Sequence, residues 1–69
     1  MRIRAYQKGE LAQMYYPWCS RRHAVRCLNR DIEHAWTLRR LLQQTGWRPD
    51  NRILTPQQVA LIFNKLGEP

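Results

Sequence analysis

The amino-acid sequence predicts a mainly α-helical protein, a compact bundle of about four short helices, and it allows a tiny two-stranded β-sheet between residues 2–5 and residues 52–54. Its 69 residues are enough for one domain, which we assign to residues 1–69. Apolar residues recur at helical spacing through most of the chain. Capping residues, prolines and glycines mark where each helix begins and ends.

The first expected elements are a short strand and a helix over residues 8–15. Residues 2–6 alternate between polar and apolar, as in a half-buried strand. Leu11, Ala12 and Tyr15 then share one face of a helix. Pro17 ends that helix, because the residue before a proline is displaced from the helical conformation.

Two further helices are expected between Ser20 and Gly46. Ser20 is a good N-cap, because its hydroxyl can accept a hydrogen bond from the first turn of the second helix. We favour a bend between the two helices near residues 33–35, and Gly46 suits the left-handed position that ends a helix. The apolar stripe of the second helix comprises Ala24, Val25, Leu28 and Ile32, and that of the third comprises Trp36, Leu38, Leu41 and Leu42.

The last helix has the firmest start signal in the chain. Thr55 is placed as its N-cap, Pro56 occupies the first helical position and Gln58 completes a capping box. Residues 48–51 form a turn by their composition, and residues 52–54 then supply the second strand. The apolar face of the last helix comprises Val59, Ile62, Phe63 and Leu66, and Gly67 ends it.

The short length argues against an enzyme. A chain of this size buries only about 60% of the surface of its unfolded form, which leaves little room for a lined cleft and a rigid scaffold. No nucleophile, base and orienting acid fall together in the sequence, because Ser20 already serves as a helix cap. We therefore expect no catalytic residues, no cofactor and no small-molecule substrate.

Membrane and targeting segments are not expected either. No apolar run approaches the roughly 20 residues that span a bilayer. The N-terminal segment MRIRAYQKGE carries positive charges without a following apolar core, so it does not form a secretory signal. These two observations predict a cytoplasmic protein without a membrane partner.

Positive charge is the strongest signal in the composition. Ten arginines and two lysines face five acidic residues, which gives a formal net charge of +7 at pH 7. Such a balance favours polyanionic partners, with nucleic acid first and an anionic membrane or an acidic protein next. Because the planar guanidinium group of arginine pairs with phosphate and with guanine edges, the excess of arginine favours a nucleic-acid-binding module, with DNA as the expected partner and RNA as a weaker alternative.

The first half of the chain carries the pattern Lys8-Gly9-Glu10-Leu11-Ala12, a turn, and Ser20-x3-Ala24-x3-Leu28. This pattern resembles the helix-turn-helix of small excisionase-like and mercury-resistance-regulator-like proteins. The resemblance implies a helix-turn-helix-like domain in which Ala12 lets the two helices cross closely and the second helix enters the major groove. The turn is about two residues longer than usual in this motif. Tyr16 stands where glycine is common, and a bulky residue would be strained there at positive φ.

A second resemblance extends over nearly the whole chain. It rests on Lys8-x-Glu10-Leu11-Ala12-x-x-Tyr15-x-Pro17, on Leu54-Thr55-Pro56-x-Gln58-Val59, and on the closing Leu66-Gly67-Glu68-Pro69. Together these motifs resemble a family of short uncharacterised proteins from gut anaerobic bacteria. The resemblance implies one compact domain and carries no activity over to this chain.

An arginine ridge, formed by Arg22, Arg26 and Arg30, is expected on the second helix. These residues recur every four positions, about 40° apart around the helix and roughly opposite the apolar stripe. We interpret them as DNA contacts, mostly to phosphate and one to a guanine edge. The alternative is a solvated face whose charges pair with Asp31 and Glu33.

Other basic residues have secondary roles in this interpretation. Lys8 and Arg21 are assigned as auxiliary phosphate ligands. Arg2, Arg4 and Arg52 lie on the two expected strands. There they form either a wing-like contact to the DNA backbone or, as the favoured alternative, a set of charges that prevents an edge strand from pairing with other chains and aggregating.

Two cysteines and a histidine raise a metal hypothesis. Cys19, His23 and Cys27 recur every four residues, and His34 falls on the same helical side. Cys19 precedes the helix cap and need not share the geometry of the helix, and a straight stripe of this spacing spreads its ligands over about 12 Å of helix rise, so we expect no metal. The same separation excludes a disulfide, and free thiols are expected.

Two aromatic residues in the turn between the first two expected helices indicate an alternative function. Tyr16 and Trp18 are the aromatic side chains most expected to be exposed, whereas most of the others belong in a small core. Together with an exposed side of the last helix, these aromatics can anchor a protein partner or a second copy of the chain, and the basic residues of the second helix would then face an acidic protein. The sequence thus favours a regulatory or architectural DNA-binding protein, with a protein-interaction adaptor as the alternative.

Overall fold

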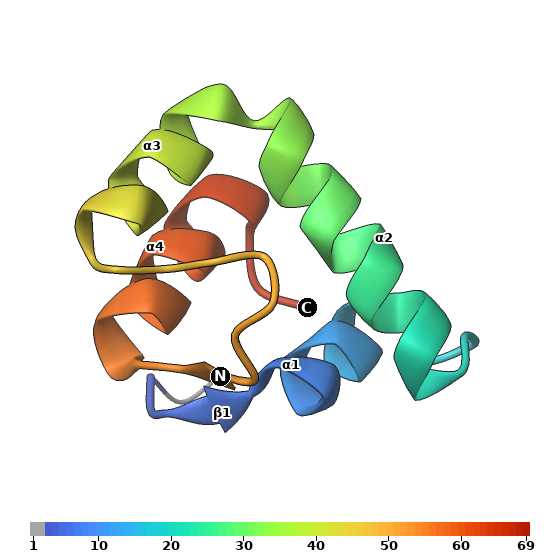
Figure 1. Ribbon diagram of the computed structural model, residues 1–69. Coiled ribbons are helices and arrows are strands. Elements are labelled where there is room, and N and C mark those ends of the chain that lie inside the picture. Colours follow the sequence, from blue (N-terminus) through green and yellow to red (C-terminus); the bar gives the residue numbers. More distant parts are fainter. Residues whose placement is uncertain (1–2) are drawn as a thin grey trace.

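Figure 1 shows a computed structural model of the protein, which describes residues 3–69. Helices α1, α2 and α3 form an arc, and α4 lies against its inner side. The predicted mainly α-helical bundle with a tiny sheet is confirmed. In this part of the chain the elements follow in the order β1 (Tyr6–Gln7), α1 (Lys8–Tyr15), α2 (Arg21–His34), α3 (Trp36–Gln44), β2 (Ile53–Leu54) and α4 (Pro56–Leu66).

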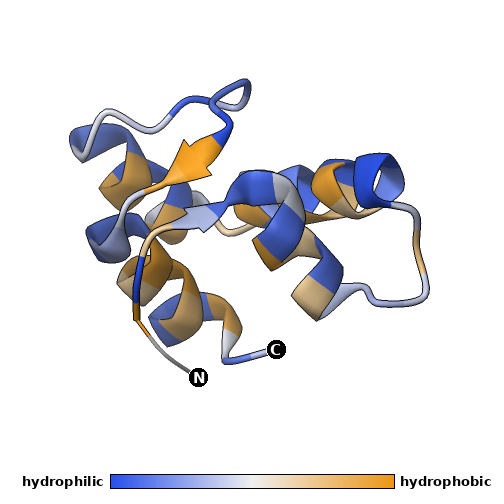
Figure 2. Ribbon diagram, turned by 90° about the horizontal axis from the view of Figure 1, so that it is seen from below, coloured by the Kyte–Doolittle hydropathy of each residue, from blue (hydrophilic) through white to orange (hydrophobic). Residues whose placement is uncertain are grey.

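The first strand begins later than the sequence predicted. β1 and β2 are antiparallel, with Tyr6 opposite Leu54 and Gln7 opposite Ile53. Residues 3–5 form no strand, and the predicted strand residue Arg2 lies outside the described residues. Tyr6 and Leu54 are both buried, so the strands pair where each contributes a side chain to the core. Figure 2 shows β2 as an apolar strand that follows a hydrophilic loop.

The turn between α1 and α2 does not need a glycine. Tyr16 follows α1 with a φ of −130°, and within residues 3–69 no residue other than glycine has a positive φ. The longer turn therefore reverses the chain without placing Tyr16 in the left-handed region. Ser20 then caps α2 as predicted, because its hydroxyl accepts a hydrogen bond from the backbone N–H of His23 at 3.2 Å.

A bend at Ala35 separates α2 from α3, as predicted. Ala35 has a φ of −97° and a ψ of 77°, which lie outside the range of an α-helix. Trp36 follows the bend and is 68% exposed, so the prediction that it belongs to the apolar stripe of the third helix is wrong. It lies about 200° around the helix from Leu38. Leu38 and Leu42 are fully buried, which leaves Trp36 on the solvent side.

α4 begins with the capping box that the sequence predicted. The Thr55 hydroxyl accepts from the N–H of Gln58 at 3.2 Å, and the Gln58 side chain accepts from the N–H of Thr55 at 3.0 Å. At the other end of α4, Gly67 has a φ of 82° and accepts a hydrogen bond from the Tyr15 hydroxyl of α1. The fully buried larger side chains of the core are Leu11, Leu28, Ile32, Leu38, Leu42, Leu54, Val59 and Ile62.

Candidate nucleic-acid interface

The arginine ridge lies on the outward face of α2. Arg22, Arg26 and Arg30 are all exposed. The opposite face is fully buried at Ala24, Leu28 and Ile32. Arg30 lies 3.8 Å from the carboxylate of Asp31, and Glu33 pairs with Arg39 of α3 instead of with the ridge. Within residues 3–69, neither Arg22 nor Arg26 has an acidic partner at ion-pair distance, so both are available to an external anion.

Arg21 reaches from the start of α2 across the start of α1. Its guanidinium group donates a 2.6 Å hydrogen bond to the side-chain oxygen of Gln7. The side chain passes over Gly9, where an added Cβ atom would stand 2.2 Å from the Nε of Arg21. Gly9 therefore provides the space that seats Arg21. The residue itself remains exposed, so its charge can still act at the surface.

An open groove runs beside the first turns of α2. It lies between the start of α1, the start of α2 and residues 49–53, which precede α4. Arg21 and Arg22 line it from α2, and Arg52 lines it from the opposite segment. Asp50 is the one acidic residue that lines it among the described residues. The sequence contains no local signal for this groove, because the groove depends on contacts between segments far apart in the chain.

The three arginines expected on the strands do not form one positive patch. Arg52 lines the groove. Arg4 lies 3.7 Å from the centre of the Tyr6 ring and 3.3 Å from the Glu10 carboxylate, so its charge has an internal partner. Arg2 lies outside the described residues. Among the described residues, Arg52 is therefore the one residue of the predicted wing-like contact that the structure places beside the positive surface of α2.

Lys8 is not placed like the phosphate ligand that the sequence predicted. The residue is only 3% exposed, and its Nζ donates to the carbonyl oxygens of Pro49 at 2.8 Å and Arg48 at 3.3 Å. Nζ also lies 5.1 Å from the centre of the Trp47 ring. Burial lowers the pKa of Lys8 to about 8, although the negative charge of Asp50 acts in the opposite direction. The ammonium group thus holds residues 48–49 against α1.

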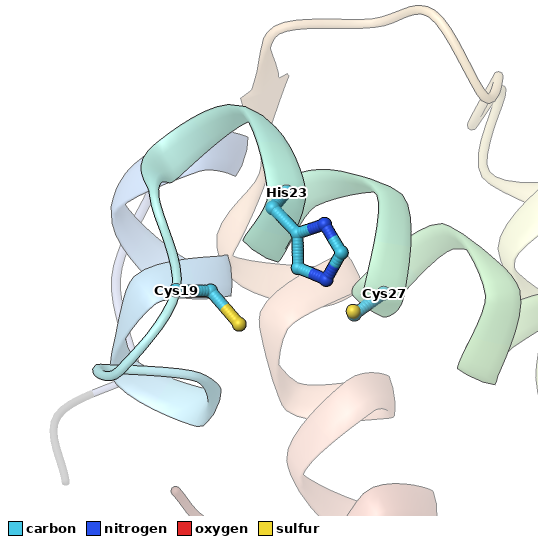
Figure 3. A group of neighbouring side chains, drawn as sticks. All are labelled: Cys19, His23 and Cys27. Atoms are coloured by element: carbon cyan, nitrogen blue, oxygen red, sulfur yellow. The ribbon is translucent and has the colours of Figure 1, made fainter.

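Cys19, His23 and Cys27 come together at the start of α2 (Figure 3). One ligand atom from each residue lies within 4.8 Å of the other two. The prediction that these ligands are spread along a straight stripe is wrong, because Cys19 precedes the helix and the extended backbone of Ser20 turns it back. Both thiols are free, and desolvation together with the adjacent Cys27 raises the pKa of Cys19. His34, at the far end of α2, is not part of the group.

The turn between α1 and α2 exposes one large aromatic side chain. Trp18 is 77% exposed, which confirms the prediction for this residue. Tyr16 is half-buried, and its ring meets that of Trp18 edge to face with 5.7 Å between ring centres. The Tyr16 hydroxyl donates to the Asp31 carboxylate, and this hydrogen bond raises the pKa of Tyr16. Tyr16 is therefore tied to α2, whereas Trp18 faces solvent.

Comparisons with known proteins identify a family but no activity. The model of a family described as a domain of unknown function (DUF4248) matches residues 2–69. No curated protein and no solved structure matches the chain. No helix among residues 3–69 is long and apolar enough to cross a membrane.

Proposed function

The chain belongs to the DUF4248 family, whose function is unknown, and we propose that it is a small, non-enzymatic DNA-binding protein with a regulatory or architectural role. The observation that carries the proposal is the pair Arg22 and Arg26. Both are exposed on the outward face of α2, and neither has an acidic partner within residues 3–69. The net charge of +7 adds a long-range attraction to nucleic acid.

In this proposal α2 is the recognition helix of a helix-turn-helix-like pair. Ala12 on α1 and Ala24 on α2 are small and fully buried, which supports a close crossing of the two helices. The opposite face of α2 then enters a major groove, which is about 12 Å wide and admits one helix. The arginine ridge contacts phosphates there, and one of its members pairs with a guanine edge.

The groove beside α2 extends the same positive surface. Arg21 and Arg52 line its two sides, where they can contact the DNA backbone next to α2. Lys8 takes no direct part in the proposal, because its ammonium group is already bonded to the carbonyl oxygens of Arg48 and Pro49.

Fluorescence anisotropy with a mixed-sequence DNA duplex, titrated at several salt concentrations, tests the proposal. For the wild type, the logarithm of the association constant should fall steeply with the logarithm of the salt concentration, because each neutralised phosphate contributes about −0.9 to the slope. The double variant Arg22→Ala/Arg26→Ala should bind more weakly, with a slope that is shallower by about 1.8.

A matched control removes the same charge elsewhere on the surface. Arg40 of α3 and Lys65 of α4 are exposed, and neither has an acidic partner at ion-pair distance in the described part of the chain. Arg40→Ala/Lys65→Ala should therefore keep most of the affinity and of the slope. Equal losses in the two double variants would contradict the proposal, as would the absence of binding by the wild type at low salt.

A protein-interaction adaptor is the second candidate function, and the exposure of Trp18 favours it. A tryptophan that is 77% exposed and packed on one side against Tyr16 is suited to anchor a protein partner. In that case Trp18→Ala should weaken partner capture, or self-association in analytical ultracentrifugation, and leave the DNA affinity unchanged. Comparison of duplex DNA with RNA of matched length distinguishes RNA binding from both functions.

A further inference from the structure

Cys19, His23 and Cys27 take no part in the proposed DNA interface, yet they bring three metal-binding side chains to one point (Figure 3). Cys19 comes from the turn between α1 and α2, and the other two come from successive turns of α2. The side chains point toward one another. This convergence of two sulfur atoms and one imidazole nitrogen is the pattern of a site for a soft metal ion.

The spacing of the ligand atoms is close to that of a zinc site. Zinc binds cysteine sulfur at about 2.3 Å and histidine nitrogen at about 2.0 Å with tetrahedral geometry, so adjacent ligand atoms stand about 3.5 to 3.8 Å apart. In the structure the three ligand atoms lie within 4.8 Å of one another, so the largest of these separations exceeds the spacing in a zinc site by about 1 Å. Small rotations about the side-chain torsions can close that difference, and the helical backbone can stay in place.

The surroundings allow an ion to enter and to be held. His23 is exposed, and Cys19 is half-buried, so the ion reaches the ligands from solvent. Cys27, only 8% exposed, forms the inner side of the site. A divalent cation between the two sulfur atoms removes the repulsion that two neighbouring thiolates would have.

We propose that Cys19, His23 and Cys27 bind one Zn²⁺ ion through two thiolates and one imidazole nitrogen, with the fourth tetrahedral position open to water or to a ligand from outside the chain. Binding releases the two thiol protons to solvent, and the two thiolates then balance the charge of the ion. Harder ions such as Mg²⁺ and Ca²⁺ prefer oxygen and fit this donor set poorly. The ion joins the turn before α2 to the first two turns of the helix.

A titration of the reduced protein with Zn²⁺, in competition with a chromogenic chelator, measures affinity and stoichiometry. We expect one ion per chain. Co²⁺ then serves as a spectroscopic probe of the same site. Thiolate ligation should give an intense near-ultraviolet charge-transfer band, and tetrahedral geometry should give strong bands in the visible range.

Single substitutions of the ligands separate this site from adventitious binding. Cys19→Ser and His23→Gln should each lower the Zn²⁺ affinity by more than about 100-fold, which exceeds the usual effect of residues that merely orient a ligand. His34→Gln is the matched control, because His34 is exposed on the same helix and lies outside the group. The exposed position of His23 means that His23→Gln keeps the core intact, even if Cys19→Ser weakens the fold.

Three results would overturn the proposal. One is an equal Zn²⁺ affinity in the wild type and in His23→Gln. Another is a cobalt complex without the thiolate charge-transfer band. The third is a stoichiometry of one ion per two chains, which would place the metal between two copies of the protein. None of these measurements involves DNA, so they test the metal site independently of the proposed function.

Discussion

Raising the pH from about 7 to about 9.5 is expected to stabilise the folded protein relative to a variant that lacks Lys8. Burial lowers the pKa of Lys8 in the folded protein from 10.5 to about 8. The unfolded chain exposes this lysine to water and keeps the ordinary pKa. Between these two pKa values the unfolded chain binds more protons than the folded protein, so the free energy of unfolding rises with pH.

The size of this effect follows from the shift in pKa. The difference between 10.5 and about 8 corresponds to about 3 kcal/mol, of which about 2 kcal/mol develops between about pH 7 and about pH 9.5. We expect about 1 kcal/mol of this to remain, because two backbone carbonyl oxygens offset part of the desolvation of the ammonium group. The hydrogen bonds to Pro49 and Arg48 act against the shift, since they favour the charged form.

Urea unfolding, followed by tryptophan fluorescence, measures the effect in the wild type and in Lys8→Met at both pH values. The stability of the wild type minus that of Lys8→Met should increase by about 1 kcal/mol at the higher pH. The other titratable groups are present in both proteins, so their contributions cancel in this difference. A difference that stays constant would refute the reasoning, because the carbonyl bonds would then be keeping Lys8 charged up to its ordinary pKa.

Two further substitutions test the packing and the capping of the helices. Leu28→Ala removes a fully buried side chain of α2 and should lower the free energy of unfolding in urea by about 2 to 5 kcal/mol; a loss below about 1 kcal/mol would contradict its place in the core. Thr55→Ala removes the hydroxyl that accepts from Gln58 and should cost about 1 kcal/mol in the same assay. Thr37→Ala, at an exposed position of α3, is the control and should change stability by less than about 0.5 kcal/mol.

The ends of the helices could be predicted because neighbouring residues determine them. Ser20 and Thr55 each accept a hydrogen bond from the backbone three residues later, and Gly46 takes a positive φ after α3. The outward position of Arg22 and Arg26 follows in the same way from helical periodicity. For these features a short stretch of sequence contains all the interacting groups.

Contacts between distant segments could not be predicted from such patterns. Cys19 meets His23 and Cys27 because the turn folds back on α2, and helical periodicity does not describe a turn. From the sequence, Lys8 is expected to be an exposed residue in the first turn of a helix. It is buried because residues 48–49, which are distant in the sequence, cover it and accept its hydrogen bonds. The groove beside α2 depends on that closure, so its position follows from the tertiary structure and not from any motif.

Lys8 and Gly9 are neighbours in α1, and each positions one side of the groove. Lys8 bonds residues 48–49, and Gly9 gives room to the side chain of Arg21. Both sides are thus attached to a single helical turn, which makes the groove preorganised. A ligand that enters it meets two sides already held in place, so less conformational entropy is lost on binding than if both sides had to be ordered by the ligand.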